Sequence, residues 1–147
     1  MLLLGVKNTT SQTVLTGELI NLGSVYRRYC KKNSCGVKTF DFNTNSIALQ
    51  QQGMYKITVS ATFTGTAAGT ATIQLLENGI VVPGAVASET ITTAGTEIRS
   101  ISFDYYVLVD SACLLGNVST AAKNISLQNT GVGTTITSLV VDVLKVS

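Results

Sequence analysis

The sequence contains no histidine and no tryptophan, and it has only one proline and three cysteines among 147 residues. The absence of histidine removes the side chain that most often serves as a general base or a metal ligand. The eight acidic residues are scattered singly, whereas calcium needs clustered oxygen ligands, and cysteine without histidine gives little support for zinc. We therefore expect no metal, no cofactor and no enzymatic activity, because no nucleophile is paired with a base.

Charge is also scarce, and long apolar runs are missing. Only 12% of the residues are charged, against about 25% in an average globular protein, while 45% are hydrophobic and the mean hydropathy is +0.35. No apolar run approaches the ~18 residues of a membrane helix, and the first four residues are too short for a signal peptide. The surplus of apolar residues therefore predicts a core plus a subunit interface, as in an obligate oligomer.

The pattern that is present has a period of two. From Tyr55 to Phe63 every second residue is apolar or small, and the residues between are polar, which predicts a strand with one buried face. Asn78-Gly79 between two apolar runs predicts a hairpin, and Pro83 is expected to end the strand that follows.

The spacing of the strands and turns indicates the architecture. Short strands separated by turns every 8–15 residues recur, and no segment has a convincing helical period. This pattern predicts an all-β, antiparallel, two-sheet jelly-roll sandwich over residues 13–147. Residues 1–12 are predicted to be a separate N-terminal arm, because a polar segment follows a short apolar tip.

The final run, from Ile136 to Val146, is apolar on both faces. A strand of this kind is buried on both faces, and in an antiparallel sheet a partner subunit best explains what covers the outer one. The long strand predicted before it, from Thr96 to Val109, also becomes apolar on its outward face toward its end, at Tyr106 and Leu108. The predicted subunit interface comprises Tyr106, Leu108, Ile136, Val140, Leu144 and Val146.

Two further segments are candidate binding sites. The arm is suited to lodging in a groove or adding a strand to another protein's sheet, with disorder as the alternative; its anchoring residues are Leu2, Leu3, Leu4 and Val6. A basic segment follows, whose binding residues are Tyr26, Arg27, Arg28, Tyr29, Lys31 and Lys32. It is either a solvated loop, a contact with a capsid protein or neighbouring subunit, or, least expected, a nucleic-acid contact. Cys30 and Cys35, close by, are either free thiols or bridged.

Several motifs resemble the complement/tumour-necrosis-factor-like globular head, in its bacterial and bacteriophage branch. They are Ile47-x-Leu49, Gly53-x-Tyr55-x-Ile57, the Leu75–Gly79 segment, the strand Ile101–Val109 and the Ile125-Ser-Leu127-Gln-Asn segment, and they span Ser46 to Val146. The resemblance implies a ten-stranded jelly roll, a homotrimer and a structural or binding role. A collagen-like stalk is missing, and a basic, cysteine-containing loop is inserted among the early strands.

The function expected from these observations is structural. The resemblance implies a trimeric bacteriophage head fibre or decoration protein on the virion surface, bound to the capsid or another virion protein and in contact with a host-surface glycan. The alternative is a secreted or spore-surface adhesin head that binds carbohydrate. Neither reading involves a membrane span.

Overall fold

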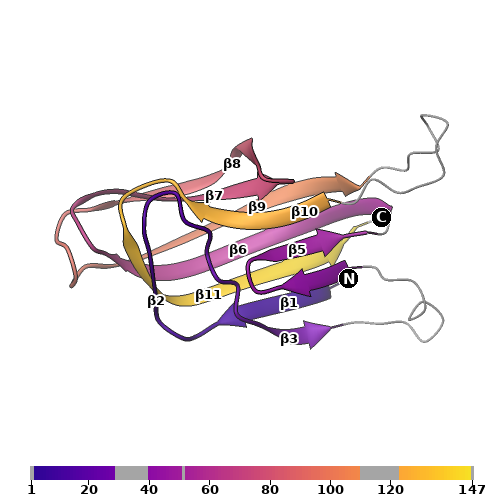
Figure 1. The fold of residues 1–147 in the computed structure, drawn as a ribbon, viewed down its shortest axis with the longest axis horizontal. Helices are drawn as coiled ribbons and strands as arrows, with labels where there is room; N and C mark the ends of the chain where they lie inside the picture. Colours follow the sequence, from indigo (N-terminus) through magenta and orange to yellow (C-terminus); the bar gives the residue numbers. More distant parts are fainter. Residues whose placement is uncertain (1, 29–39, 51, 110–122, 147) are drawn as a thin grey trace.

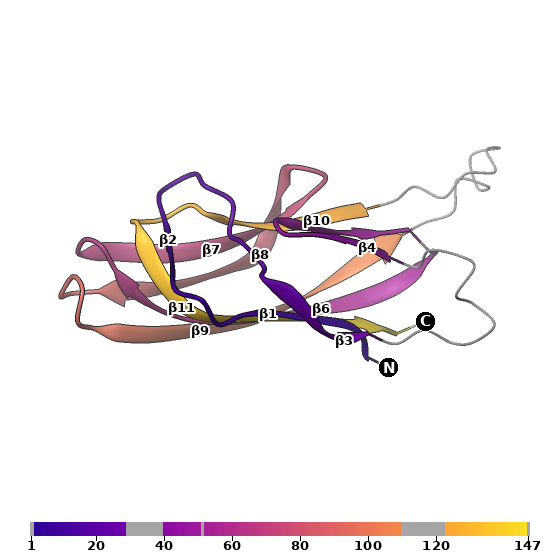
Figure 2. The ribbon, with the colours of Figure 1, turned by 60° about the horizontal axis from the view of Figure 1, so that its bottom comes forward.

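The fold is built from strands arranged in two layers. The structure is a computed structural model; it describes residues 2–28, 40–50, 52–109 and 123–146, with the side chains of Leu2, Phe40 and Asp41 outside that description. In these ranges eleven strands form two antiparallel sheets that face each other (Figures 1 and 2). The same ranges contain no helix long and apolar enough to cross a membrane.

The strand order is that of a jelly roll, in which the chain crosses several times from one sheet to the other. The six-stranded sheet has the order β3 (Ser24–Arg28), β1 (Leu2–Asn8), β11 (Thr134–Lys145), β6 (Gly53–Gly65) and β9 (Ile98–Val109), and β2 (Gln12–Val14) pairs with β11 off this path. The five-stranded sheet has the order β4 (Phe40–Asn43), β5 (Ser46–Leu49), β10 (Lys123–Asn129), β7 (Gly69–Glu77) and β8 (Ile80–Ile91). The predicted two-sheet sandwich is therefore confirmed.

The core lies between the two sheets. On β6 the alternating residues Tyr55, Ile57, Val59, Ala61 and Phe63 are all buried, as the period of two predicts. Their polar neighbours point to the opposite side of the same sheet, which is therefore its outer face.

The N-terminal residues form a strand of the fold, so the prediction of a separate arm is wrong for residues 2–8. They form β1, which pairs with β11 on one side and with β3 on the other. Leu3, Leu4 and Val6 are buried in the core, and they are therefore not available to anchor the protein elsewhere. A β-bulge between Leu2 and Leu4 turns both Leu3 and Leu4 inward, which hides the alternation in the sequence.

The strand β8 begins as predicted but continues past the proline. Asn78 and Gly79 both have positive φ angles, +54° and +79°, in the two-residue turn between β7 and β8. Pro83 does not end the strand, because its neighbours leave the ladder in a bulge and β8 resumes at Val86 opposite Gln74. Gln74 is buried, and its Nε2 atom lies 2.8 Å from the carbonyl oxygen of Val82 and 3.1 Å from that of Ala85.

Candidate functional site: the outer face of the six-stranded sheet

Three long strands, β11, β6 and β9, present most of the outer face. Their continuous pairing places residues of the three strands side by side in rows that cross the sheet. The rows differ in chemistry along the strands, from apolar at the end where β11 finishes to hydroxyl-rich in the middle.

The apolar patch, defined as Met54, Tyr106, Leu108, Leu144 and Val146, occupies the end of this face near the C-terminus. Leu144 and Tyr106 flank Lys56 in one row, Met54 faces Leu108 in the next, and the Val146 nitrogen donates to the Met54 carbonyl at 2.8 Å. Tyr106, Leu108 and Val146 are 54%, 52% and 55% exposed, and Met54 is 38% exposed. Apolar side chains gathered in adjacent rows mark a surface suited to protein contact.

Most of the predicted interface residues lie together on this face, but Ile136 does not. Ile136 is 1% exposed and belongs to the core, so the prediction that it lies at a subunit interface is wrong. The physical reason is a β-bulge between Ile136 and Ser138, opposite Phe63 and Thr62, which reverses the side on which residues before it point. Val140, beyond the bulge, is half-buried in the row between Lys7 and Ser60.

A charged row crosses the sheet next to the apolar patch. Pairing aligns Arg27 with Gly5, Gly5 with Asp142, Asp142 with Thr58, and Thr58 with Asp104. Lys56 and Asp104 form an ion pair with 3.6 Å between Nζ and Oδ2. At one edge of the sheet this row ends in Arg27, which forms no ion pair among the described residues. At the other edge it ends in Asp104, whose side chain is half exposed.

Tyr26 reaches across this row from the edge strand. Its hydroxyl donates to Asp142 Oδ1 at 2.5 Å, and the Lys7 ammonium lies 5.4 Å from the ring centroid. A Cβ atom at Gly5 would lie 2.6 Å from the ring, so only glycine leaves room for Tyr26 to lie over β1. The hydrogen bond to Asp142 is the main cause that raises the pKa of Tyr26.

The centre of the face is lined by small hydroxyl side chains. Ser60, Thr62, Ser100, Ser102 and Ser138 surround a shallow hollow of about 220 Å³. Thr62 and Ser100 share a hydrogen bond of 3.2 Å between their hydroxyl oxygens. Because these side chains are short, they leave the hollow open to solvent in the single chain.

Only part of the predicted basic segment is described. Tyr26, Arg27 and Arg28 are exposed on β3 at the edge of the six-stranded sheet, beside the charged row. Tyr29, Lys31 and Lys32, together with Cys30 and Cys35, lie outside the described residues. The pairing that joins Arg27 to the same row as Asp104 had no signal in the sequence, because it depends on how distant strands align.

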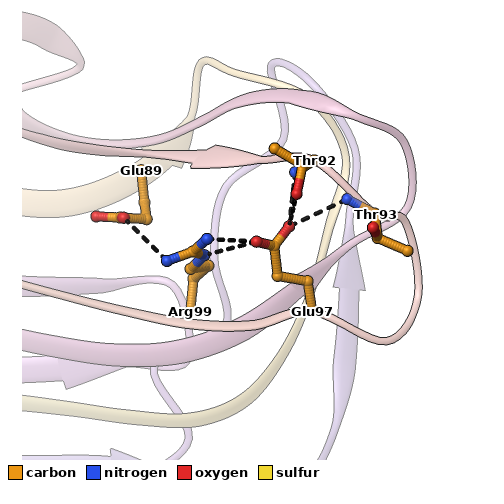
Figure 3. A network of polar contacts seen from close by, with 5 residues as sticks. All are labelled: Glu89, Thr92, Thr93, Glu97 and Arg99. Carbon is orange, nitrogen blue, oxygen red and sulfur yellow. Dashed lines mark hydrogen bonds and ion pairs between the residues drawn. The ribbon is translucent and has the colours of Figure 1, made fainter.

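The acidic residues Glu89 and Glu97 form a polar network with a different role (Figure 3). One Glu97 oxygen accepts hydrogen bonds from the backbone nitrogens of Thr92 and Thr93 at 2.6 and 3.0 Å, and the other binds Arg99, which also lies 3.7 Å from Glu89. The Thr93 and Thr92 backbone donors and Arg99 lower the Glu97 pKa to about 2. A carboxylic acid that donates a proton in glycoside hydrolysis needs a raised pKa, so this network fits a turn-stabilising role. Within the described ranges, no three histidine, cysteine or acidic residues group as metal ligands would.

Comparison with known proteins gives likeness in structure but not in sequence. No protein-family model and no curated protein matches the sequence. The Eiger TNF structure from S. frugiperda superposes with a TM-score of 0.64 and 9% identity, covering 99% of this chain and 93% of that one. Murine APRIL gives a TM-score of 0.63 with 7% identity, covering 97% of this chain and 98% of that one.

A vertex protein shares the same arrangement of strands. The PRD1 vertex protein P5 superposes with a TM-score of 0.53 and 16% identity, over 98% of this chain and 96% of that one. At such identities the likeness concerns the fold alone. The chain therefore has the all-β, two-sheet jelly-roll fold of tumour-necrosis-factor-like proteins, as its sequence motifs predict.

Proposed function

We propose that the chain is a non-enzymatic structural protein of a virion, a homotrimeric head fibre or decoration protein that attaches to the capsid. The observation that carries this proposal is the apolar patch, which leaves Tyr106 and Leu108 more than half exposed on the outer sheet face in a single chain. Burial against two further copies removes this surface from water, and each subunit then contributes to a shared apolar centre. The likeness to the PRD1 vertex protein P5 supports a place on a particle surface.

The trimer is tested by the mass of the protein in solution. Sedimentation at micromolar concentration is expected to give three times the chain mass of 15.4 kDa. Replacing both Tyr106 and Leu108 by lysine is expected to yield folded monomers, because charged side chains would have to be desolvated at the subunit contact. Ile80→Lys is the matched control, since Ile80 is 72% exposed on the other sheet. A wild-type monomer at this concentration contradicts the proposal.

Attachment to the particle requires a separate experiment. Purified protein is mixed with assembled particles that lack it, and the amount that sediments with the particles is measured. Saturable binding in a multiple of three copies supports the decoration role. Absence of binding, together with retention on a glycan array, contradicts it and favours the adhesin reading with a carbohydrate ligand.

A further inference from the structure

The charged row of the outer face ends in opposite charges at the two edges of the sheet. At the β3 edge it begins with Arg27, and at the β9 edge it ends with Asp104. Between them, Gly5, Asp142 and Thr58 occupy the same row on the three central strands. The two charged groups therefore stand at the same height along the strands but on opposite sides of the subunit.

The two ends have unused capacity for an ion pair. Among the described residues, Arg27 forms no ion pair with a carboxylate, and Asp142, which shares its row, accepts a hydrogen bond from Tyr26. Asp104 contacts Lys56 at 3.6 Å, and its side chain remains 50% exposed. A carboxylate can accept about four hydrogen bonds, so Asp104 retains free acceptor sites. Lys7, whose ammonium lies over the Tyr26 ring, adds a second positive charge on this side of the sheet.

Threefold symmetry brings opposite edges of neighbouring subunits together. In a closed ring each contact is heterologous, so one side of a subunit meets a different side of the next. If the axis runs along the strands, the rotation moves no group along that axis, and groups in one row meet at equal height. Resting on the trimer of the proposed function, we propose that Arg27 of each copy pairs with Asp104 of its neighbour.

This pair gives the contact its orientation, and the apolar patch gives it most of its stability. The charged row lies directly beside the row of Tyr106, so the pair would lie at the polar border of the apolar contact. Complementary charges at such a border select the correct alignment of partners and disfavour others by placing like charges together. An alignment slipped along the strands would set Arg27 opposite hydroxyl or apolar rows.

A charge swap tests the pairing. The dissociation constant of the trimer is measured by sedimentation for the wild type, Arg27→Asp, Asp104→Arg and the double variant. Each single variant places like charges together at three contacts and is expected to raise the constant by about tenfold or more, whereas the double variant restores it to within about threefold of wild type. Raising the salt concentration to ~0.5 M is expected to shrink the differences, because exposed charges are screened.

A mismatched pair is the control. Arg27→Asp combined with Glu89→Arg also exchanges one acid and one base, but Glu89 lies on β8 outside the charged row, so no restoration is expected. The milder Arg27→Gln and Asp104→Asn variants and their combination supply a second, non-additive test if Asp104→Arg disturbs Lys56. A wild-type trimer without restoration in the double variants overturns only the pairing. A wild-type monomer overturns both the pairing and the trimer.

Discussion

At the residue scale, Glu97 holds the turn between β8 and β9 in place through its charged form. Its carboxylate accepts from two backbone nitrogens, from the Thr92 hydroxyl at 3.0 Å and from Arg99. These donors favour the ionised carboxylate over the protonated one. The same contacts that make Glu97 unsuitable as a general acid thus make it a stabilising group of the turn.

The pH dependence of stability is expected to report on Glu97. Its pKa falls from the ordinary 4.5 to about 2 in the folded protein, so its contribution is fully present above about pH 4.5. That contribution is lost as the pH falls toward 2. Glu97→Gln is expected to be less stable than wild type in urea at pH 7, with the difference shrinking toward pH 2. A constant difference across this range would contradict the assignment; Glu89→Gln, which keeps the turn contacts, is the control.

Gln74 has a similar stabilising role inside the five-stranded sheet, where its side chain binds backbone groups. Its amide nitrogen donates to the carbonyls of Val82 and Ala85. Both residues are buried, and because they lie in the bulge of β8 they have no ladder partner on β7. Gln74→Leu is expected to lower the free energy of unfolding by about 1–3 kcal/mol, because buried acceptors lose their donor. Gln128→Leu, which removes a single exposed 3.0 Å bond to the Gly17 carbonyl, is the control. Equal losses in urea unfolding would show that Gln74 has no special role.

At the element scale, β1 belongs to the folded domain and supplies part of its core. Leu4 is completely buried between β11 and β3, so Leu4→Ala is expected to cost about 2–5 kcal/mol of unfolding free energy. Leu15 is 55% exposed, and Leu15→Ala is expected to change stability by less than about 0.5 kcal/mol. Urea unfolding followed by circular dichroism measures both. Similar small losses would mean that β1 detaches without affecting the fold.

The strands whose patterns were regular were predicted well, and those with bulges were not. β6 and the β7–β8 hairpin follow from alternation and from Asn78-Gly79, which are local signals. The bulges in β1 and β11 change the side of Leu3 and Ile136, and nothing in the local sequence marks them. A bulge is set by the partner strand, so alternation alone assigns residues before it to the wrong face.

At the scale of the whole molecule, the outer face of the six-stranded sheet relates the fold to assembly. The wild-type melting temperature is expected to rise with protein concentration, because association stabilises the folded chain by mass action. The Tyr106→Lys, Leu108→Lys double variant is expected to melt at a temperature independent of concentration. Differential scanning calorimetry over a hundredfold concentration range distinguishes the two. A concentration-independent wild type would contradict assembly through the apolar patch.

By itself the sequence determined the fold class, the buried face of the central strands and the surplus of apolar surface, because alternation and composition are properties of neighbouring residues. Four of its predicted interface residues, Tyr106, Leu108, Leu144 and Val146, lie together in the apolar patch, and Val140 lies nearby on the same face. Only the tertiary structure decided that β1 lies inside the sheet, that Ile136 faces the core, and that Arg27 and Asp104 share a row. These features depend on the register between strands far apart in the chain, which hydrogen bonding across the sheet sets and no local pattern encodes.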